Sequence, residues 1–155
     1  MTIHAYVNPQ RKGSGLAGQL DMLLENNLQE VARVIDRIEL FCVEESISAS
    51  QGLRFCLALD EIITNILSYG LAGRADGEIT LFVEHSNGAL WAEIADNGPE
   101  FDPFAAETPV PSGSVEERNV GGLGITLIKA VMDQLEYRRD GGRNRLNIAM
   151  KLSAA

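Results

Sequence analysis

Apolar residues recur every three or four positions in two long stretches of the chain, a spacing typical of amphipathic helices. The first stretch covers residues 28–45, and Asn27 with Glu30 three positions later forms a capping-box-like pattern at its start. The second covers about 51–69, and a shorter third helix is predicted from 125 to about 133. The predicted packing sides of the two long helices are Leu28, Val31, Val34, Ile35, Ile38, Phe41 and Cys42 in the first and Leu53, Cys56, Leu57, Ile63, Ile66 and Leu67 in the second.

Elsewhere apolar and polar residues alternate, which is typical of strands with one buried face. We predict a strand beginning at Gln19, a hairpin over 79–95 that turns at Asn87-Gly88, and a second hairpin over 135–152. The resulting order is strand, helix, helix, strand pair, long loop, helix, strand pair. This order predicts an α+β fold, a two-layer sandwich in which helices cover one face of a mixed, mainly antiparallel sheet.

Residues 1–18 are rich in turn-forming residues and are predicted to be a loosely ordered lead-in, with a short strand at residues 3–7. The lead-in contains the spacing Gly13-x-Gly15-x-x-Gly18, but Asn-Pro-Gln-Arg-Lys precedes it where a dinucleotide-binding turn requires a buried strand. Residues 19–155 are expected to form one domain, because a chain of 155 residues that is 45% hydrophobic suits a single core.

Charge and composition exclude several classes of protein. A formal net charge of −9 argues against nucleic-acid binding, which needs a basic surface. The sequence has no apolar run of about 18 residues, so no membrane span is expected, and its start does not resemble a signal peptide. Cys42 and Cys56 lie within apolar helical patterns, so we expect buried thiols and a reducing, cytoplasmic location. The two histidines, His4 and His85, are too far apart in sequence to suggest a metal site.

The second predicted helix carries polar residues that a packed helix would not need. Glu61 and Asn65 lie four positions apart and therefore share a face. Taken alone, this pair fits a solvated helix edge as well as a site for a nucleotide and its metal ion. An amide oxygen at Asn65 could ligate magnesium, and a carboxylate at Glu61 could act as a general base.

Two further features follow along the chain. Asp96 ends a predicted strand and could accept a hydrogen bond from an exocyclic amine such as that of adenine, while Gly98 would let a base approach the backbone. The glycines of the segment 121–124 precede a helix, where free backbone N–H groups can hold phosphates. Each feature has a simpler interpretation, as a turn and as a helix cap respectively. The P-loop pattern is absent from the sequence.

Three segments, in this order, resemble the motifs of a known superfamily. Leu59-Asp-Glu-Ile-Ile-Thr-Asn65 resembles the N box of the GHKL ATPases, which share the Bergerat ATP-binding fold. The segment 96–103 resembles their first glycine box, and the segment 121–128 their second. The most similar branch is that of the bacterial anti-sigma-factor serine/threonine kinases, which the segment 137–146 also resembles. The resemblance covers about residues 19–152.

The resemblance implies a set of roles for residues of this chain. It implies Glu61 as catalytic base, Asn65 as the ligand of Mg²⁺, and residues 99–121 as a lid over ATP. The residues it implies in ATP binding are Asn65, Asp96, Gly98, Phe101, Gly121, Gly122, Leu123 and Gly124. The chain departs from the family at Ser68-Tyr69, where a histidine is frequent, and Arg118 is the sole basic residue of the predicted lid.

The resemblance also implies an activity and partners. The expected activity is ATP- and Mg²⁺-dependent serine/threonine kinase activity toward an anti-anti-sigma (STAS-type) protein, with a sigma factor as the competing partner. Family members commonly dimerise, so the resemblance also implies a homodimer.

Other functions are compatible with parts of this pattern. The main alternative is a non-catalytic nucleotide-binding regulator that sequesters a partner protein, for which a base at Glu61 would be unnecessary. A sensor histidine kinase would need a phosphoacceptor helix, and neither His4 nor His85 lies in a predicted helix. A gyrase-type or chaperone ATPase would need further domains.

Overall fold

The computed structural model describes residues 18–104 and 122–153. The predicted lead-in over 1–17, its short strand, and the part of the predicted lid from 105 to 121 lie outside the described residues. Gly121, one of the predicted phosphate-binding residues, also lies outside them.

The described residues form five strands, three α-helices and one π-helix. The strands are β1 Gln19–Leu24, β2 Ile79–Ser86, β3 Ala89–Asp96, β4 Gln134–Asp140 and β5 Arg143–Lys151. The helices are α1 Gln29–Glu44, α2 Ala49–Asn65, the π-helix η1 Ile66–Gly70 and α4 Gly122–Val131.

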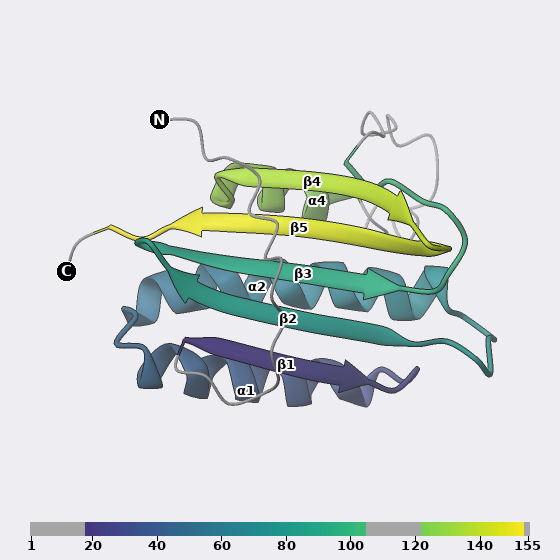
Figure 1. Cartoon of the computed structure of the whole chain (residues 1–155), viewed down its shortest axis with the longest axis horizontal. Helices are drawn as coiled ribbons and strands as arrows, with labels where there is room; N and C mark the ends of the chain where they lie inside the picture. The colour runs from purple at the N-terminus through teal and green to yellow at the C-terminus, as the bar shows by residue number, and fades with distance from the viewer. Residues whose placement is uncertain (1–17, 105–121, 154–155) are drawn as a thin grey trace.

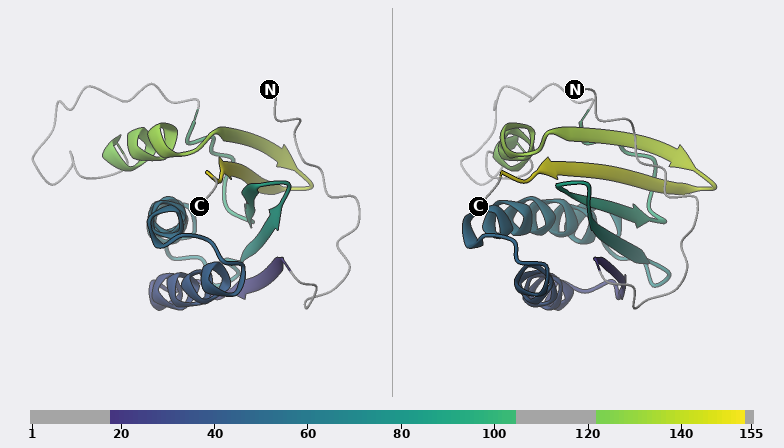
Figure 2. Two further views of the ribbon diagram at one scale, coloured as in Figure 1. Left: turned by 90° about the vertical axis from the view of Figure 1, so that its left-hand side faces the viewer. Right: turned by 60° about the vertical axis from the view of Figure 1, so that its left-hand side comes forward.

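The strands make one sheet in the order β1-β2-β3-β5-β4 (Figure 1). Figure 2 shows all three α-helices on the same face of this sheet, so the predicted α+β sandwich is confirmed. Every strand pairing among the described residues is antiparallel, whereas a mixed, mainly antiparallel sheet was predicted. Two of the four pairs, β2–β3 and β4–β5, are hairpins and are antiparallel for that reason. The other two are joined through helices: α1, α2 and η1 lie between β1 and β2, and α4 and β4 lie between β3 and β5.

Both predicted hairpins turn where the sequence places small residues. Asn87 and Gly88 have φ angles of 51° and 71°, and Gly141 and Gly142 have 58° and 75°. Two successive positive φ angles are typical of a type I′ turn, whose twist matches that of the paired strands. The register of both hairpins follows from these turns.

The packing side of α2 was predicted only in part. Leu53 and Leu57 are 59% and 44% exposed, while Leu59 is fully buried. The buried residues of α2 are Gln51, Gly52, Phe55, Cys56, Ala58, Leu59, Ile62 and Ile63. Apolar residues surround most of this helix, so periodicity alone could not distinguish the core-facing stripe from its neighbour.

The first helix shows a smaller error of the same kind. The residues of α1 that are buried are Val34, Ile38, Phe41 and Cys42, all of which were predicted. Leu28 is 59% exposed and lies just before the helix. The side chain of Asn27 accepts a hydrogen bond from Gln29 N at 2.9 Å, and the Glu30 carboxylate accepts one from Glu25 N at 3.3 Å. The N-cap residue is Leu28, whose side chain makes no capping hydrogen bond, so the predicted capping box with Asn27 at the N-cap is not formed.

The second long helix changes type at Ile66, where the apolar pattern predicts that the α-helix continues. From Ile66 to Gly70 the chain is a π-helix, and Leu71 N donates to Ile66 O at 2.9 Å, five residues back. Such wide turns are rare and frequently occur at functional sites. No helix in the described ranges is long and apolar enough to cross a membrane.

Candidate functional site

Helix α2 places Glu61 and Asn65 on its flank. The sheet-facing side of the helix is fixed by buried residues such as Leu59 and Ile63, and the two polar residues lie beside that side, each partly buried. Asp60, the next acidic residue, is exposed and accepts a hydrogen bond from Thr64 Oγ1 at 3.1 Å. Glu61 and Asn65 therefore share a face of α2, as predicted. This face is partly buried, unlike the solvent-exposed side of the helix that carries Asp60.

The start of α4 lies directly against Glu61. A Cβ atom built on Gly124 would lie 1.9 Å from Glu61 Oε1 and 2.2 Å from Glu61 Cγ, so a larger residue here would displace the Glu61 side chain from this position. Gly122 and Leu123 precede it in the first turn of α4. The structure thus joins two of the predicted site segments, the polar helix and the second glycine cluster.

Asp96 closes strand β3 and is buried. Its Oδ1 accepts hydrogen bonds from Gly98 N at 2.8 Å and from Asn144 Nδ2 at 3.1 Å. A Cβ atom on Gly98 would lie 2.8 Å from Asp96 Oδ1 and 3.1 Å from Gly70 O. The hydrogen bond from Gly98 N to Asp96 Oδ1 closes a turn, as the simpler interpretation predicts. That interpretation does not predict the close approach of Gly98 to the Gly70 carbonyl.

These contacts arrange the site along a single element. The element formed by α2 and η1 meets Gly124 at Glu61 and meets Gly98 at Gly70, with Asn65 between the two contacts. At about 1.5 Å per residue of α-helix, Asn65 lies about 6 Å beyond Glu61 along the axis, and Gly70 lies further on at the end of η1. The candidate base, the candidate metal ligand and the candidate adenine contact therefore follow one another in a line.

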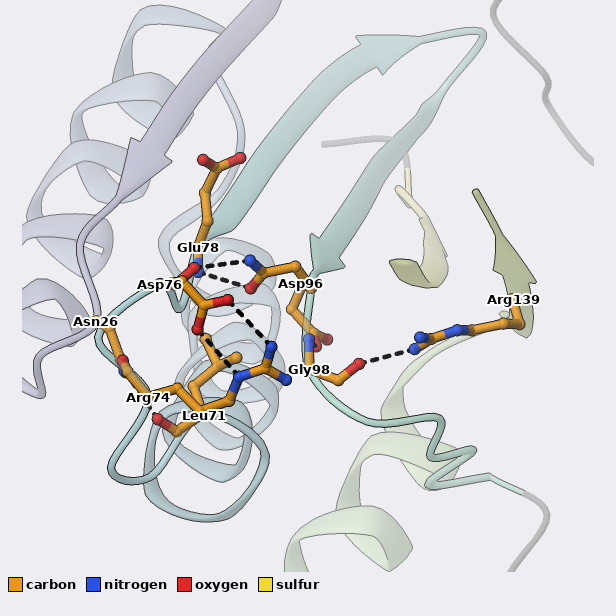
Figure 3. A network of polar contacts seen from close by, with 9 residues as sticks. Asn26, Leu71, Arg74, Asp76, Glu78, Asp96, Gly98 and Arg139 are labelled. Carbon is orange, nitrogen blue, oxygen red and sulfur yellow. Dashed lines mark hydrogen bonds and ion pairs between the residues drawn. The ribbon is translucent and has the colours of Figure 1, made fainter. Parts of the chain in front are cut away.

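The loop between η1 and β2 is held by side-chain amides. Asn97 Oδ1 accepts from Glu78 N at 2.8 Å, and Asn97 Nδ2 donates to Asp76 O at 2.7 Å. Asn26 Nδ2 donates to Leu71 O at 2.8 Å. Figure 3 shows this loop next to Asp96 and Gly98, so the amides fix the backbone on which the first glycine box rests.

The polar network around Asn144 was not predicted. Asn144 is 4% exposed, and its Oδ1 accepts from Tyr137 Oη at 2.7 Å and from Arg139 Nη1 at 3.1 Å. Partial burial raises the pKa of the Tyr137 phenol, which keeps its hydroxyl protonated and able to donate. Arg139 Nη1 also donates to Gly98 O at 2.8 Å (Figure 3). The sequence did contain one indication of this network. Positions 144, 146 and 148 alternate on the buried face of the last strand, and position 144 is polar where the other two, Leu146 and Ile148, are apolar.

Phe101 was predicted to contact the nucleotide. Its side chain is 64% exposed, and its backbone N–H donates to Asn144 Oδ1 at 3.2 Å. The described structure therefore places the backbone of Phe101 in the Asn144 network and leaves its ring at the surface.

The two cysteines are buried and form no disulfide, as predicted. Burial raises the pKa of the Cys56 thiol to about 12 and also raises that of Cys42, so both thiols stay neutral near pH 7. In the part of the chain that the structure describes, no group of three or more His, Cys, Asp and Glu side chains could hold a metal ion. The oxygens of Glu61 and Asn65 remain the metal-site candidates that the sequence suggested.

Fold and site together define an ATP-binding domain of the GHKL class. A five-stranded antiparallel sheet has its helices on one face, and a polar helix flank lies between two glycine-containing segments. The sequence profile of the histidine kinase-like ATPase domain matches residues 24–150. The chain belongs to this family, and the resemblance found in the sequence is confirmed.

Within this family, the chain is similar to curated proteins named as serine kinases and as an anti-sigma factor. Serine/threonine-protein kinase BtrW of Bordetella bronchiseptica is 34% identical over 101 residues, which cover 64% of this chain and 71% of that protein. Serine-protein kinase RsbW of Listeria innocua is 32% identical over 90 residues, covering 56% of this chain and 57% of that protein. Anti-sigma F factor of Clostridium botulinum is 34% identical over 80 residues, covering 50% and 54%. The match spans little more than half the length of the last two proteins.

Solved structures agree on the fold. The RsbU and RsbW domains of Rv1364c from Mycobacterium tuberculosis match with a TM-score of 0.65 at 15% identity, over 88% of this chain and 33% of that chain. The histidine kinase domain of the blue-light activated histidine kinase from Erythrobacter litoralis matches with a TM-score of 0.51 at 18% identity, over 90% and 66%. At these identities the likeness concerns the fold alone.

Proposed function

We propose that this protein is an ATP- and Mg²⁺-dependent serine/threonine protein kinase that acts as an anti-sigma regulatory factor. Its substrate would be a serine or threonine of an anti-anti-sigma, STAS-type protein, and its competing partner would be a sigma factor in the cytoplasm. Relatives named as serine kinases and as an anti-sigma factor support this assignment.

One observation carries the proposal: the order of contacts along α2 and η1. Gly98 lies against Gly70 at one end, Asn65 follows, and Gly124 lies against Glu61 at the other end. Adenine, the phosphate-bound metal and the reacting γ-phosphoryl group follow one another in the same order along an extended ATP molecule. A solvated helix edge would require no such order.

The adenine end is built around a buried acceptor. Both hydrogen bonds that Asp96 accepts, from Gly98 and Asn144, reach Oδ1. In the proposed complex, Oδ2 accepts a hydrogen bond from the exocyclic amine of adenine. Such a bond to a buried carboxylate favours a base with a donor at that position.

The residues in the middle of the site fit magnesium. Mg²⁺ prefers oxygen ligands and takes most of them from phosphates and water, needing only one or two from protein. The amide of Asn65, partly buried beside Glu61, can supply one. When bound, the ion would neutralise phosphate charge.

Glu61 would act at the far end. Its carboxylate would accept the proton of the attacking serine or threonine hydroxyl, whose oxygen forms the new bond to the γ-phosphorus as ADP leaves. The absence of a side chain at Gly124 gives the Glu61 carboxylate its place beside α4. Phosphorylation of the antagonist would then leave this protein free to bind the sigma factor.

The decisive experiment is phosphoryl transfer from labelled ATP, with magnesium, to candidate STAS-type proteins. We expect Glu61→Gln to lose transfer by about 100-fold or more, the typical contribution of a general base. The matched control is Asp60→Asn, because Asp60 is the neighbouring acid of α2 but is exposed.

Two results would contradict different parts of this proposal. The absence of transfer to the natural antagonist, under conditions where ATP binds, would contradict the kinase assignment and favour the alternative of a regulator that sequesters its partner without catalysis. Full transfer by Glu61→Gln would contradict the role of Glu61 as the catalytic base.

A further inference from the structure

Asn144 joins three parts of the molecule through its side-chain amide. Its Nδ2 donates to Asp96 Oδ1 at 3.1 Å and to Pro99 O at 2.7 Å. Strands β3 and β5 pair in a register that sets Asp96 directly opposite Asn144. The amide therefore connects the end of β3 to the first residues of the loop that follows it.

The orientation of this amide is determined by its partners. Three donors converge on Asn144 Oδ1, namely the Tyr137 hydroxyl at 2.7 Å, Arg139 Nη1 at 3.1 Å and Phe101 N at 3.2 Å. An amide turned by 180° would set its NH₂ group against these donors and its oxygen against the two acceptors. The donor side of Asn144 is thus held toward Asp96.

This arrangement restricts the carboxylate of Asp96. Its Oδ1 receives N–H groups from two directions, one from Gly98 in its own loop and one from Asn144 in the neighbouring strand. Two such bonds to one oxygen oppose rotation of the carboxylate, and buried polar networks of this kind stay rigid when fully satisfied. The second oxygen, Oδ2, is thereby held in one direction.

We propose that Asn144 is a positioning residue that determines base specificity by aiming Asp96 Oδ2 at the exocyclic amine of the nucleotide. The inference rests on the proposed function, because it requires Asp96 to contact the base. Asn144 itself does not touch the nucleotide and acts through the carboxylate.

A purely structural role for Asn144 predicts a different result. A residue that only stabilises the fold would change the affinity for every nucleotide by the same factor, because it would change the fraction of folded protein. A positioning residue changes the ratio of affinities between a base with the amine and one without it. The ratio therefore separates the two roles.

The test compares ATP with purine riboside triphosphate, which lacks the exocyclic amine, by calorimetric titration of the full chain with magnesium. We expect the parent protein to prefer ATP by at least about tenfold, the typical effect of a hydrogen bond to a charged acceptor. Asn144→Ser should bring this preference close to unity. Asn144→Asp, which keeps the shape and removes the donor, should do the same and provides a second variant where the first is poorly folded.

Tyr137→Phe is the matched control. It removes one hydrogen bond from the same network, but Arg139 and Phe101 still hold the amide, so the preference for ATP should persist. Circular dichroism establishes that each variant is folded before its affinities are compared.

The possible outcomes distinguish this inference from the proposed function. A parent protein that binds ATP without preference over purine riboside triphosphate would overturn the role of Asp96 and this inference together. A parent protein with the preference, and Asn144 variants that retain it in full, would overturn the inference alone. Loss of the preference in Asn144→Ser or Asn144→Asp, with Tyr137→Phe unchanged, would establish it.

Discussion

At position 124 the backbone of α4 approaches the Glu61 side chain so closely that any side chain there would displace it. The Cβ of an alanine there would overlap the Glu61 carboxylate and its Cγ. Glycines at the start of a helix are often attributed to phosphate binding through backbone N–H groups. For Gly124 the structure supports a second reason, which is that the chain must leave space for the candidate base.

We predict that Gly124→Ala reduces phosphoryl transfer by about 10- to 100-fold, because the displaced Glu61 carboxylate no longer meets the attacking hydroxyl. ATP affinity should change much less, since the adenine end of the site is untouched. Single-turnover transfer and calorimetric ATP titration measure the two quantities separately.

The control is Ala130→Ser, an exposed position of the same helix, which should retain both activities. Equal losses of transfer and ATP affinity in Gly124→Ala would contradict the positional role. They would show instead that the whole start of α4 had moved.

Proximity within one helix was predictable from the sequence, and contacts between strands were not. Glu61 and Asn65 share a face because helical geometry alone sets residues four apart on one side. Asn144 donates a hydrogen bond to Asp96, which lies 48 residues away in the sequence. Alternation marks Asn144 as core-facing, but nothing in the sequence names its partner.

Among the elements, α2 contributes both Glu61 and Asn65 to the candidate site. Its apolar residues form two stripes, one buried and one largely exposed. Leu59 is fully buried, whereas Leu57, two positions earlier, is 44% exposed. We predict that Leu59→Ala destabilises the protein by about 2–5 kcal/mol through the lost burial and the cavity left behind. Leu57→Ala should stay within about 0.5 kcal/mol, as is typical of surface substitutions.

Urea denaturation followed by circular dichroism measures both free energies of unfolding. Similar costs for the two variants would contradict the burial seen here. They would mean that the stripe containing Leu53 and Leu57 is covered in solution, for example by a second copy of the chain.

Whether a segment forms a helix or a strand was predictable where its hydrophobic pattern is long or its turn residues are distinctive. A change of helix type within such a segment was not predictable. The hairpin at Asn87-Gly88 followed from turn chemistry, and its positive φ angles confirm the prediction. The π-helix at Ile66–Gly70 was missed because a single wide turn shifts the apolar pattern by one residue, too little to see in five residues.

For the whole molecule, the central fact is that β5 inserts between β3 and β4. The sequence predicted both hairpins but not which of their strands would meet, because alternation specifies a buried face and not a neighbour. The pairing of β3 with β5 brings the second hairpin to the end of β3. The site thus combines a locally predictable helix with a sheet order that only the structure supplies.

Ligand binding should stabilise the entire domain, since ATP is expected to bind only the folded chain. At 100 times its dissociation constant, ATP with magnesium should add about 2.7 kcal/mol of stability. For a domain of this size that corresponds to a rise in Tm of about 5–10 °C. We predict that Asn65→Ala removes the magnesium-dependent part of this rise while leaving the Tm without ligand nearly unchanged.

Thermal melts with ATP, in the presence of magnesium or of a chelator, measure this effect. Thr64→Ala is the control, because it alters the neighbouring position and an exposed hydrogen bond to Asp60. A full magnesium-dependent shift in Asn65→Ala would show that the metal ligand lies elsewhere.

The wide turn of η1 has a consequence for insertions and deletions. A π turn accommodates one residue more than an α turn, so removing one residue from the segment 66–70 would allow the α-helix to continue. The residues after the deletion would keep nearly their present direction around the helix axis, because four residues of α-helix turn through about the same angle as five residues of the wider π turn. The contact at the Gly98 end and the positions of Glu61 and Asn65 would therefore both persist. A one-residue deletion elsewhere in α2, between Glu61 and Asn65, would instead rotate everything after it by about 100° and separate the two ends of the site.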